Sequence, residues 1–329
     1  MEKLRKFSNK YGIYMVFVVV FAAASLLSPY FCTTRNIINI LRQVSVYGVL
    51  AFGMTIILIN GMTDLSMGSV LAFAGIVGID LFLKTHSFII AILAAIVTAM
   101  ACGAVNAFTI TTFNLPPFIA TLAMDLIARG SVYLYTGGYP IYQIGDFSKL
   151  STGYVGILPI PVLIMFIIML ITWFILGKTR LGRRFYAVGG NAEAARASGI
   201  GIRSTKYKAW LISSAFVGVA GCLQMARINA GLPETGMGYH GDAIAAAVVG
   251  GTAFGGGVGT ALGTLIGSLI IAILNNLLNL LGVQSYVQDV VRGLVIIAAV
   301  AWDVKGKNTK IRKVRKSIDP MAVHSGAQV

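Results

Sequence analysis

The sequence has few charged residues and few of the side chains on which enzymes and metal sites depend. Of its 329 residues, 11% are charged and 57% are hydrophobic, whereas a soluble domain carries about 25% charged residues. So few charges cannot cover a water-exposed surface, and much of the surface must face lipid. Three histidines without metal-ligand spacing predict no metal site. The cysteines Cys32, Cys102 and Cys222 lie in or beside apolar stretches, as small core residues do.

Nucleotide-binding and catalytic motifs are also missing from the sequence. It contains no Gly-rich loop that ends in Gly-Lys-Ser or Gly-Lys-Thr, the motif whose backbone cradles phosphates. No nucleophile is followed by a base in a recognisable arrangement. We therefore expect that the chain binds no cofactor and is not an enzyme.

The net charge of +15 is concentrated in three places. Of the 26 Lys and Arg residues, four fall in 1–12, eight in 178–208 and seven in 303–329. Positive charge that flanks apolar spans marks the cytoplasmic side of a membrane. This placement favours a topology signal and contact with anionic lipid over binding to nucleic acid. We expect a cytoplasmic N-terminus (1–12), a cytoplasmic loop (178–208) and a basic, disordered cytoplasmic tail (304–329).

The apolar stretches predict a single all-α transmembrane domain over residues 1–329, with about ten helices of roughly 20 residues each. Six spans precede the 178–208 loop and four follow it, so both termini can be cytoplasmic. Residues 242–255 are short and rich in glycine, and whether they cross fully stays open. The expected spans are 13–30, 43–60, 66–83, 88–113, 117–136, 157–177, 209–227, 242–255, 258–281 and 286–302.

A carboxylate, Asp64, lies between two of these spans among small polar residues that include Ser66. An ionised group at membrane depth is costly, and it should face protein, water or a partner. The segment suits either an irregular backbone that lines a cavity or a tight connection capped by Asp64 or Ser66. A weak likeness relates 60–78 to 250–267, since each is an apolar run, a small-residue break and a Gly-rich helix.

Four glycines at every fourth position, Gly255, Gly259, Gly263 and Gly267, predict one helix face that another helix approaches closely. The same helix is expected to continue to Asn275 and Asn276. Asparagine in lipid needs hydrogen-bond partners, so these two residues either join helices or line a pathway for a hydroxyl-rich solute.

Two oppositely charged pairs have helical spacing. Asp125 and Arg129 are four residues apart, and Asp289 and Arg292 are three apart. Each spacing permits an ion pair on one helix face, and structural pairing is favoured over a proton relay.

The basic loop contains the signals of a short helix. Asn191 is a good N-cap, Glu193 falls in the first turn, Arg196 comes late, and Gly199 suits the position after the last turn. Such a helix of about two turns is not stable alone in water. Its small, alanine-rich face suits a cytoplasmic protein partner better than a lipid surface.

Several motifs, in order between about 34 and 303, resemble the ribose-type sugar permeases of bacterial ABC importers, whose relatives carry xylose, arabinose, galactose or autoinducer-2. Two departures leave the solute open: Met62-Thr63 replaces Gly-Ile before Asp64, and His240-Gly241 replaces Glu-Leu before Asp242. The matching pieces are 36–43, Asp64-Leu65-Ser66 with Gly68-Ser69, 117–122, Arg129-Gly130, 189–199, Gly238-Tyr239, 242–246, Gly250-Gly251-Thr252, Asn275-Asn276 and 279–282.

The resemblance implies an inner-membrane permease with three kinds of partner. They are a cytoplasmic ATPase that carries ATP and Mg, an extracytoplasmic sugar-binding protein, and a second permease subunit, either identical or a close paralogue. The segment 182–199 resembles the coupling helix that docks on the ATPase. The coupling residues are Gly182, Arg183, Gly189, Gly190, Asn191, Glu193, Ala194, Ala195, Ser198 and Gly199. The expected pathway residues are Asp64, Ser66, Phe118, Thr121, Asn275 and Asn276.

Other functions stay open at this point. An ABC permease for a nucleoside, autoinducer-2 or an amino acid would share these motifs. A stand-alone secondary transporter would use Asp64 or Asp242 as a proton or ion site. A non-transporting scaffold or receptor would give the intramembrane polar residues no purpose.

Overall fold

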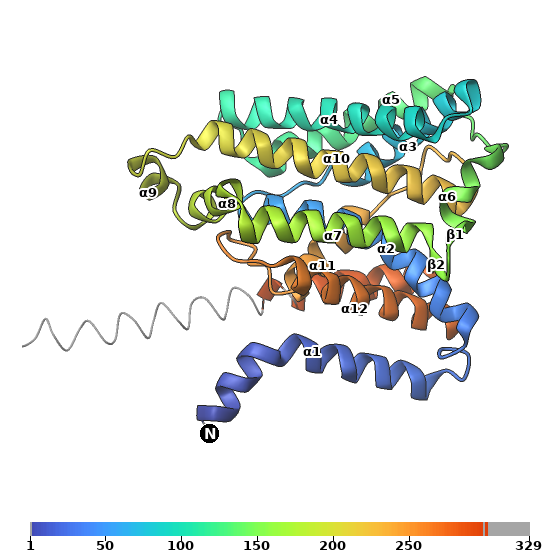
Figure 1. The fold of residues 1–329 in the computed structure, drawn as a ribbon, viewed down its shortest axis with the longest axis horizontal. Helices are drawn as coiled ribbons and strands as arrows, with labels where there is room; N and C mark the ends of the chain where they lie inside the picture. Colours follow the sequence, from blue (N-terminus) through green and yellow to red (C-terminus); the bar gives the residue numbers. More distant parts are fainter. Residues whose placement is uncertain (1, 299, 302–329) are drawn as a thin grey trace, which may run out of the picture.

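The computed structural model describes residues 2–298 and 300–301 as a bundle of helices (Figure 1). The basic tail expected at 304–329 lies outside the described residues. Within the described part of the chain, seven helices are long and apolar enough to cross a membrane. They are α2 (Thr34–Ile59), α3 (Met67–Thr85), α4 (Phe88–Thr112), α5 (Pro117–Thr136), α7 (Ile160–Lys178), α10 (Ile202–Ile228) and α12 (Ala261–Leu280).

Two further segments accompany these seven helices. Helix α1 (Glu2–Leu27) packs beside α12, and its apolar part covers Gly12–Leu27. Residues 285–298, called the last helical segment below, are also helical. The chain is a multi-pass membrane protein, as its composition predicts.

Residues 242–255, whose full crossing the sequence left open, do not form one spanning helix. Helix α11 runs from Tyr239 to Val249, and its 11 residues span only about 16 Å, about half of a 30 Å hydrocarbon core. Glycines in a left-handed backbone conformation at Gly251 (φ +85°) and Gly256 (φ +87°) end the helical path. Residues 250–260 are non-helical, and α12 begins at Ala261.

Helix α2 forms the centre of the bundle. In its most apolar stretch of 18 residues, 89% of the residues are buried inside the bundle, whereas the corresponding shares are 22% for α4 and 28% for α5. It contacts α7, α10, α11 and α12. Helices α4 and α5 therefore present most of their surface to lipid or to another subunit.

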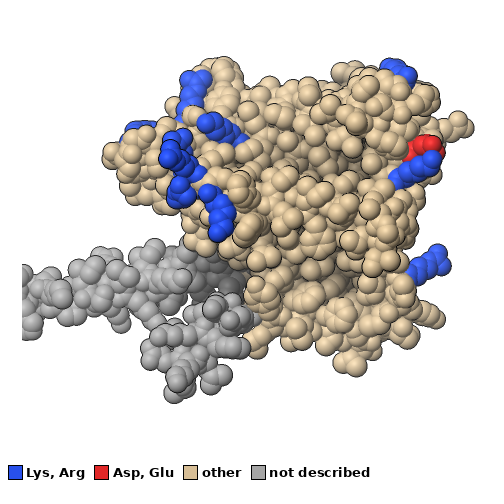
Figure 2. All heavy atoms as spheres, viewed as in Figure 1, with Lys and Arg blue, Asp and Glu red and all other residues tan. Residues whose placement is uncertain are grey.

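The two ends of the bundle differ in structure and charge. One end, called the basic end below, carries α8 (Arg180–Gly190) and α9 (Ala192–Ala197). The other, the hairpin end, carries η1 (Gly145–Ser148), α6 (Lys149–Thr152) and the antiparallel strands β1 (Tyr154–Val155) and β2 (Leu158–Pro159), with Tyr154 opposite Pro159. Figure 2 shows Lys and Arg side chains gathered at the basic end, which supports a cytoplasmic position for it. The exposed cations in this part of the chain are Lys178, Arg180, Arg183, Arg184, Arg196, Arg203 and Lys208.

Candidate functional site

Two non-helical segments interrupt the bundle, and the second contacts the end of the helix that leads into the first. Residues 60–66 separate α2 from α3, and residues 250–260 separate α11 from α12. The N–H of Gly257 donates a hydrogen bond to the carbonyl of Ile59 at 2.9 Å. Irregular backbone at membrane depth occurs where protein buries it or where it lines a cavity. In discontinuous-helix transporters, such breaks accompany the substrate site.

Asp64 forms a buried turn with Ser66, the N-cap residue of α3, which itself makes no side-chain cap hydrogen bond. Its side chain is only 3% exposed. Oδ1 accepts hydrogen bonds from the backbone N–H of Ser66 at 2.8 Å and from its hydroxyl at 2.6 Å. Asn106 on α4 in turn donates to the Ser66 hydroxyl oxygen at 3.1 Å. This geometry is that of a turn-forming carboxylate, and the buried network joins 60–66 to α4.

The ion pair expected between Asp125 and Arg129 is wrong. Asp125 accepts a hydrogen bond from the Ser69 hydroxyl at 2.6 Å. Arg129 donates to the carbonyls of Pro233 and Thr235, the latter at 3.0 Å. Helical spacing permits a pair, but both side chains find partners on other segments and tie α5 to α3 and to the loop before α11. The other expected pair, Asp289 with Arg292, is present at 3.2 Å.

The expected pathway residues do not gather in one place. Phe118 is 55% exposed on α5. Thr121 is buried, and its hydroxyl donates to the Pro117 carbonyl of its own helix at 2.9 Å. Asn276 and Asn36 exchange two amide hydrogen bonds, at 2.8 and 3.0 Å, and so join α12 to α2. Asn275 instead faces the last helical segment beside a small cavity.

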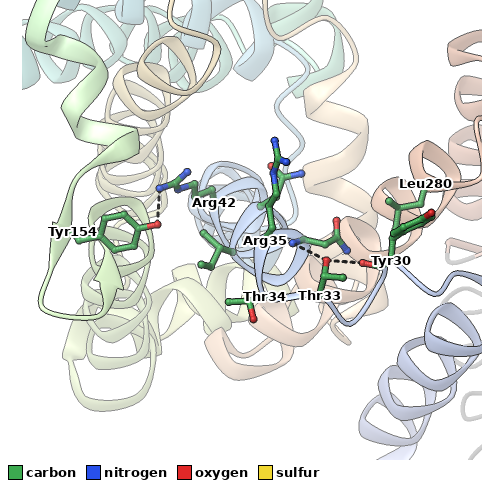
Figure 3. A pocket seen from close by; sticks show the side chains of 10 residues that line it. Tyr30, Thr33, Thr34, Arg35, Arg42, Tyr154 and Leu280 are labelled. Atoms are coloured by element: carbon green, nitrogen blue, oxygen red, sulfur yellow. Dashed lines mark hydrogen bonds between the residues drawn. The ribbon is translucent and has the colours of Figure 1, made fainter.

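A larger pocket opens at the hairpin end (Figure 3), with a volume of about 800 Å³. Arg35, Asn39 and Arg42 line it from one face of α2. Arg42 donates a hydrogen bond to the Tyr154 hydroxyl at 3.0 Å and lies 5.4 Å from the centre of that ring. Sequence reasoning did not single these residues out, although their spacing of four and three places them on one helix face. Tyr30 completes the opposite wall.

The short helix expected after Gly190 is present as α9. The Asn191 side chain accepts from the N–H of Ala194 at 3.0 Å, and Gly199 adopts φ +78°. Glu193 and Arg196 form an exposed ion pair at 3.4 Å. One expectation needs correction: Ala195 is only 4% exposed, so it holds α9 against its own subunit and is not free to dock.

Helix α8, which sequence reasoning missed, precedes α9. Thr179 caps it by accepting from the N–H of Gly182 at 3.1 Å. Phe185 and Val188 are buried, and Arg183 and Arg184 are exposed. The helix is therefore amphipathic, with its basic face outward. A spacing of three between the buried residues is the signal that could have revealed it.

The C-terminal end of α8 packs directly on both non-helical segments. A Cβ at Gly189 would overlap the Ile59 carbonyl oxygen and would lie 2.9 Å from the nitrogen of Gly257. Tyr186 donates its hydroxyl proton to the carbonyl of Gly259 at 2.8 Å. Burial raises the pKa of Tyr186, which keeps that proton in place. We call the contact of Gly189 with Ile59 and Gly257 the glycine junction.

The predicted face of four glycines is only partly correct. Gly255 and Gly259 precede α12, because Thr260 caps that helix by accepting from the N–H of Gly263 at 3.1 Å. Gly263 and Gly267 do lie on α12. A Cβ at either position would overlap a carbonyl oxygen, of Gly250 or of Ala246. These two glycines allow α12 to approach α11 closely.

These features define a class of protein: a multi-pass membrane transporter component whose broken helices surround buried polar side chains. The chain belongs to the family described as "Branched-chain amino acid transport system / permease component", whose model matches residues 36–300.

Its relatives with described functions include sugar permeases. It is 41% identical to the ribose import permease protein RbsC of Escherichia coli over 88% of this chain and 91% of the relative. It is 40% identical to the RbsC protein of Bacillus subtilis over 93% of this chain and 94% of the relative. It is 39% identical to the D-allose transport system permease protein AlsC of Escherichia coli over 90% of this chain and 92% of the relative. No solved structure matches the chain.

Proposed function

We propose that this protein is the membrane-spanning permease subunit of a bacterial ATP-driven importer for a monosaccharide. The observation that carries this proposal is the similarity over about nine-tenths of both chains to permeases named for ribose and allose. The chain would sit in the inner membrane and supply alternating access. It would bind no cofactor itself, and ATP with Mg would be held by a partner ATPase.

The basic end is the proposed docking face for that ATPase. Helix α9 exposes Glu193, Ala194, Arg196 and Ala197, and its six residues are too few for a helix to be stable alone. It is held by its Asn191 cap and by the buried Ala195. Motion of a docked partner would pass from α9 through α8 to the glycine junction.

The hairpin end is the proposed face for an extracytoplasmic sugar-binding protein. The pocket lined by Arg35, Asn39 and Arg42 opens there, and its guanidinium and amide groups suit a hydroxyl-rich solute or the carboxylates of a partner. A second permease subunit, identical or a close paralogue, would cover part of the exposed surface of α4 and α5.

An amino-acid permease is the second candidate, because the family description names branched-chain amino acids. The two candidates differ in what the complex carries. Proteoliposomes that hold the chain with a partner ATPase and a binding protein of this importer class should take up radiolabelled ribose, allose or arabinose when ATP is supplied. Uptake of leucine alone would overturn the monosaccharide assignment. Sugar uptake by the chain without the ATPase would favour a secondary transporter.

A further inference from the structure

Three polar side chains face one another between α11, α12 and the last helical segment. Asp242 comes from the first turn of α11, Asn275 from α12, and Arg292 from the last helical segment. They line a cavity of about 10 Å³ whose other walls are apolar and include Ile271, Leu274 and Val295. An ion pair of Asp242 with Arg292 accounts for two of these groups, but it does not explain why Asn275 joins them.

The polar atoms in this cavity are buried and incompletely paired. Asp242 is 2% exposed and Asn275 is 3% exposed. Neither Oδ2 of Asp242 nor Nδ2 of Asn275 has a hydrogen-bond partner among the described residues. Nε of Arg292 lies 3.6 Å from Oδ1 of Asp242, close enough to attract but beyond a hydrogen bond. Buried polar atoms are normally paired, so the cavity has unused hydrogen-bonding capacity.

The chemistry of the three groups selects one kind of ligand. Arg292 also pairs with Asp289 at 3.2 Å, but that side chain is 67% exposed and does not line the cavity. Inside the cavity, a cation is disfavoured by the Arg292 guanidinium and by the amide donor of Asn275. An anion is disfavoured by the Asp242 carboxylate. A hydroxyl group fits, because it donates one hydrogen bond to a carboxylate oxygen and accepts others from an amide or a guanidinium. A volume of about 10 Å³ holds about one water-sized oxygen.

We propose that Asp242, Asn275 and Arg292 form a binding site for one hydroxyl group of the transported solute. The assignment rests on the proposed function as a monosaccharide permease. A water molecule has the same chemistry, and the test below separates the two sources. In this conformation the cavity takes a single oxygen, and the rest of a sugar enters only when the last helical segment moves away from α12.

An aromatic pair lies outside the cavity lining, near Asp242 on α11. Tyr239, one turn before Asp242, packs edge-on against Tyr47 with ring centroids 5.0 Å apart. Its hydroxyl oxygen accepts a hydrogen bond from Gln224 of α10 at 2.9 Å. An aromatic pair beside hydroxyl-binding groups offers both an apolar face and polar atoms. These match the apolar face and the hydroxyl groups of a sugar ring.

Asn275 and Asn276 provide a matched pair of variants. Asn275→Leu removes an amide that faces the cavity, whereas Asn276→Leu removes one that is already paired with Asn36. Uptake by the assembled complex is measured for the preferred monosaccharide and for each of its monodeoxy analogues. A site built to bind a hydroxyl rejects the analogue that lacks it.

For N275L we expect the KM of the parent sugar to rise about fivefold to tenfold, while the KM of one deoxy analogue stays unchanged. For N276L we expect less protein in the membrane and unaltered discrimination among sugars. N275A, which adds no bulk, carries the same expectation as N275L if the latter does not fold. If N275L and N275A change thermal stability but shift the KM of every sugar equally, the cavity holds a structural water. That result would overturn the hydroxyl-binding site and leave the proposed function intact. Absence of monosaccharide uptake by the wild-type complex would instead overturn the proposed function and this site with it.

Discussion

Gly189→Ala should separate ATP hydrolysis from transport. The added Cβ would overlap the carbonyl oxygen of Ile59 and approach the Gly257 nitrogen to 2.9 Å. Both are backbone atoms, so the strain cannot be relieved by a side-chain rotation. The hydrogen bond from Gly257 to Ile59 joins these same two groups and is worth about 1 kcal/mol. Overpacking of this kind costs about 1–3 kcal/mol.

The neighbouring Gly190→Ala is the matched control. Gly190 lies on the same helix, and apart from its chain neighbours and the backbone of its own helix no described atom lies within 4 Å of its added Cβ. Both changes replace glycine by alanine in a helix, which favours the helix by about 1 kcal/mol in each case. The difference between the variants therefore isolates the glycine junction. A cost of about 1.4 kcal/mol or more at the junction corresponds to a loss of about tenfold or more in an equilibrium that depends on it.

The assay is the number of solute molecules taken up per ATP hydrolysed in proteoliposomes. We expect G189A to assemble with the ATPase and to hydrolyse ATP but to lose about tenfold in this ratio, while G190A stays close to wild type. Equal ratios in the two variants would refute transmission through the junction. Loss of ATPase binding by G189A would show that the residue serves docking instead.

Three other predictions follow from particular side-chain contacts and exposures. Asp64→Asn keeps an oxygen acceptor for Ser66 and should retain uptake, whereas Asp64→Ala should lower the unfolding free energy by about 1–3 kcal/mol, measured by thermal unfolding in detergent. Ala195→Glu buries a charge and should lower the amount of folded protein, whereas the exposed Ala194→Glu should fold normally and lose co-purification of the ATPase. Arg42→Gln should raise the binding-protein concentration needed for half-maximal uptake, and unchanged kinetics would remove the hairpin-end pocket from the pathway.

The apolar spans were predictable because hydrophobicity alone defines them. The expected span 117–136 coincides with α5, and 88–113 ends one residue beyond α4. The starts of α2 and α10 were placed too late, at 43 and 209 instead of Thr34 and Ile202. The first turns of both helices carry polar and basic residues that a hydropathy criterion excludes. A side-chain cap holds α2 from its first residue, since Thr33 accepts from the N–H of Asn36 at 3.4 Å.

The site was less predictable because its contacts join distant parts of the chain. Asn275 and Asn276 are adjacent and chemically identical, yet a helix turns about 100° between them. One therefore meets Asn36 on α2 and the other faces the last helical segment. The spacing of Gly255 to Gly267 likewise fits a helix, and only the left-handed backbone at Gly256 and Gly257 breaks it. Composition does not reveal where a glycine adopts positive φ.

The glycine junction gives a physical reason for two broken helices in one subunit. The carbonyl of Ile59 is the last acceptor of α2, and the N–H of Gly257 from the second non-helical segment pairs with it. Because Gly189 packs against both partners of this hydrogen bond, displacement of α8 should act on the end of α2 and on the second non-helical segment together. Residues 60–66 lead to the buried Asp64 network, and residues 250–260 lead into α12, which carries Asn275. Because packed backbone is nearly incompressible, a shift at the basic end should reach both polar sites together, as alternating access requires.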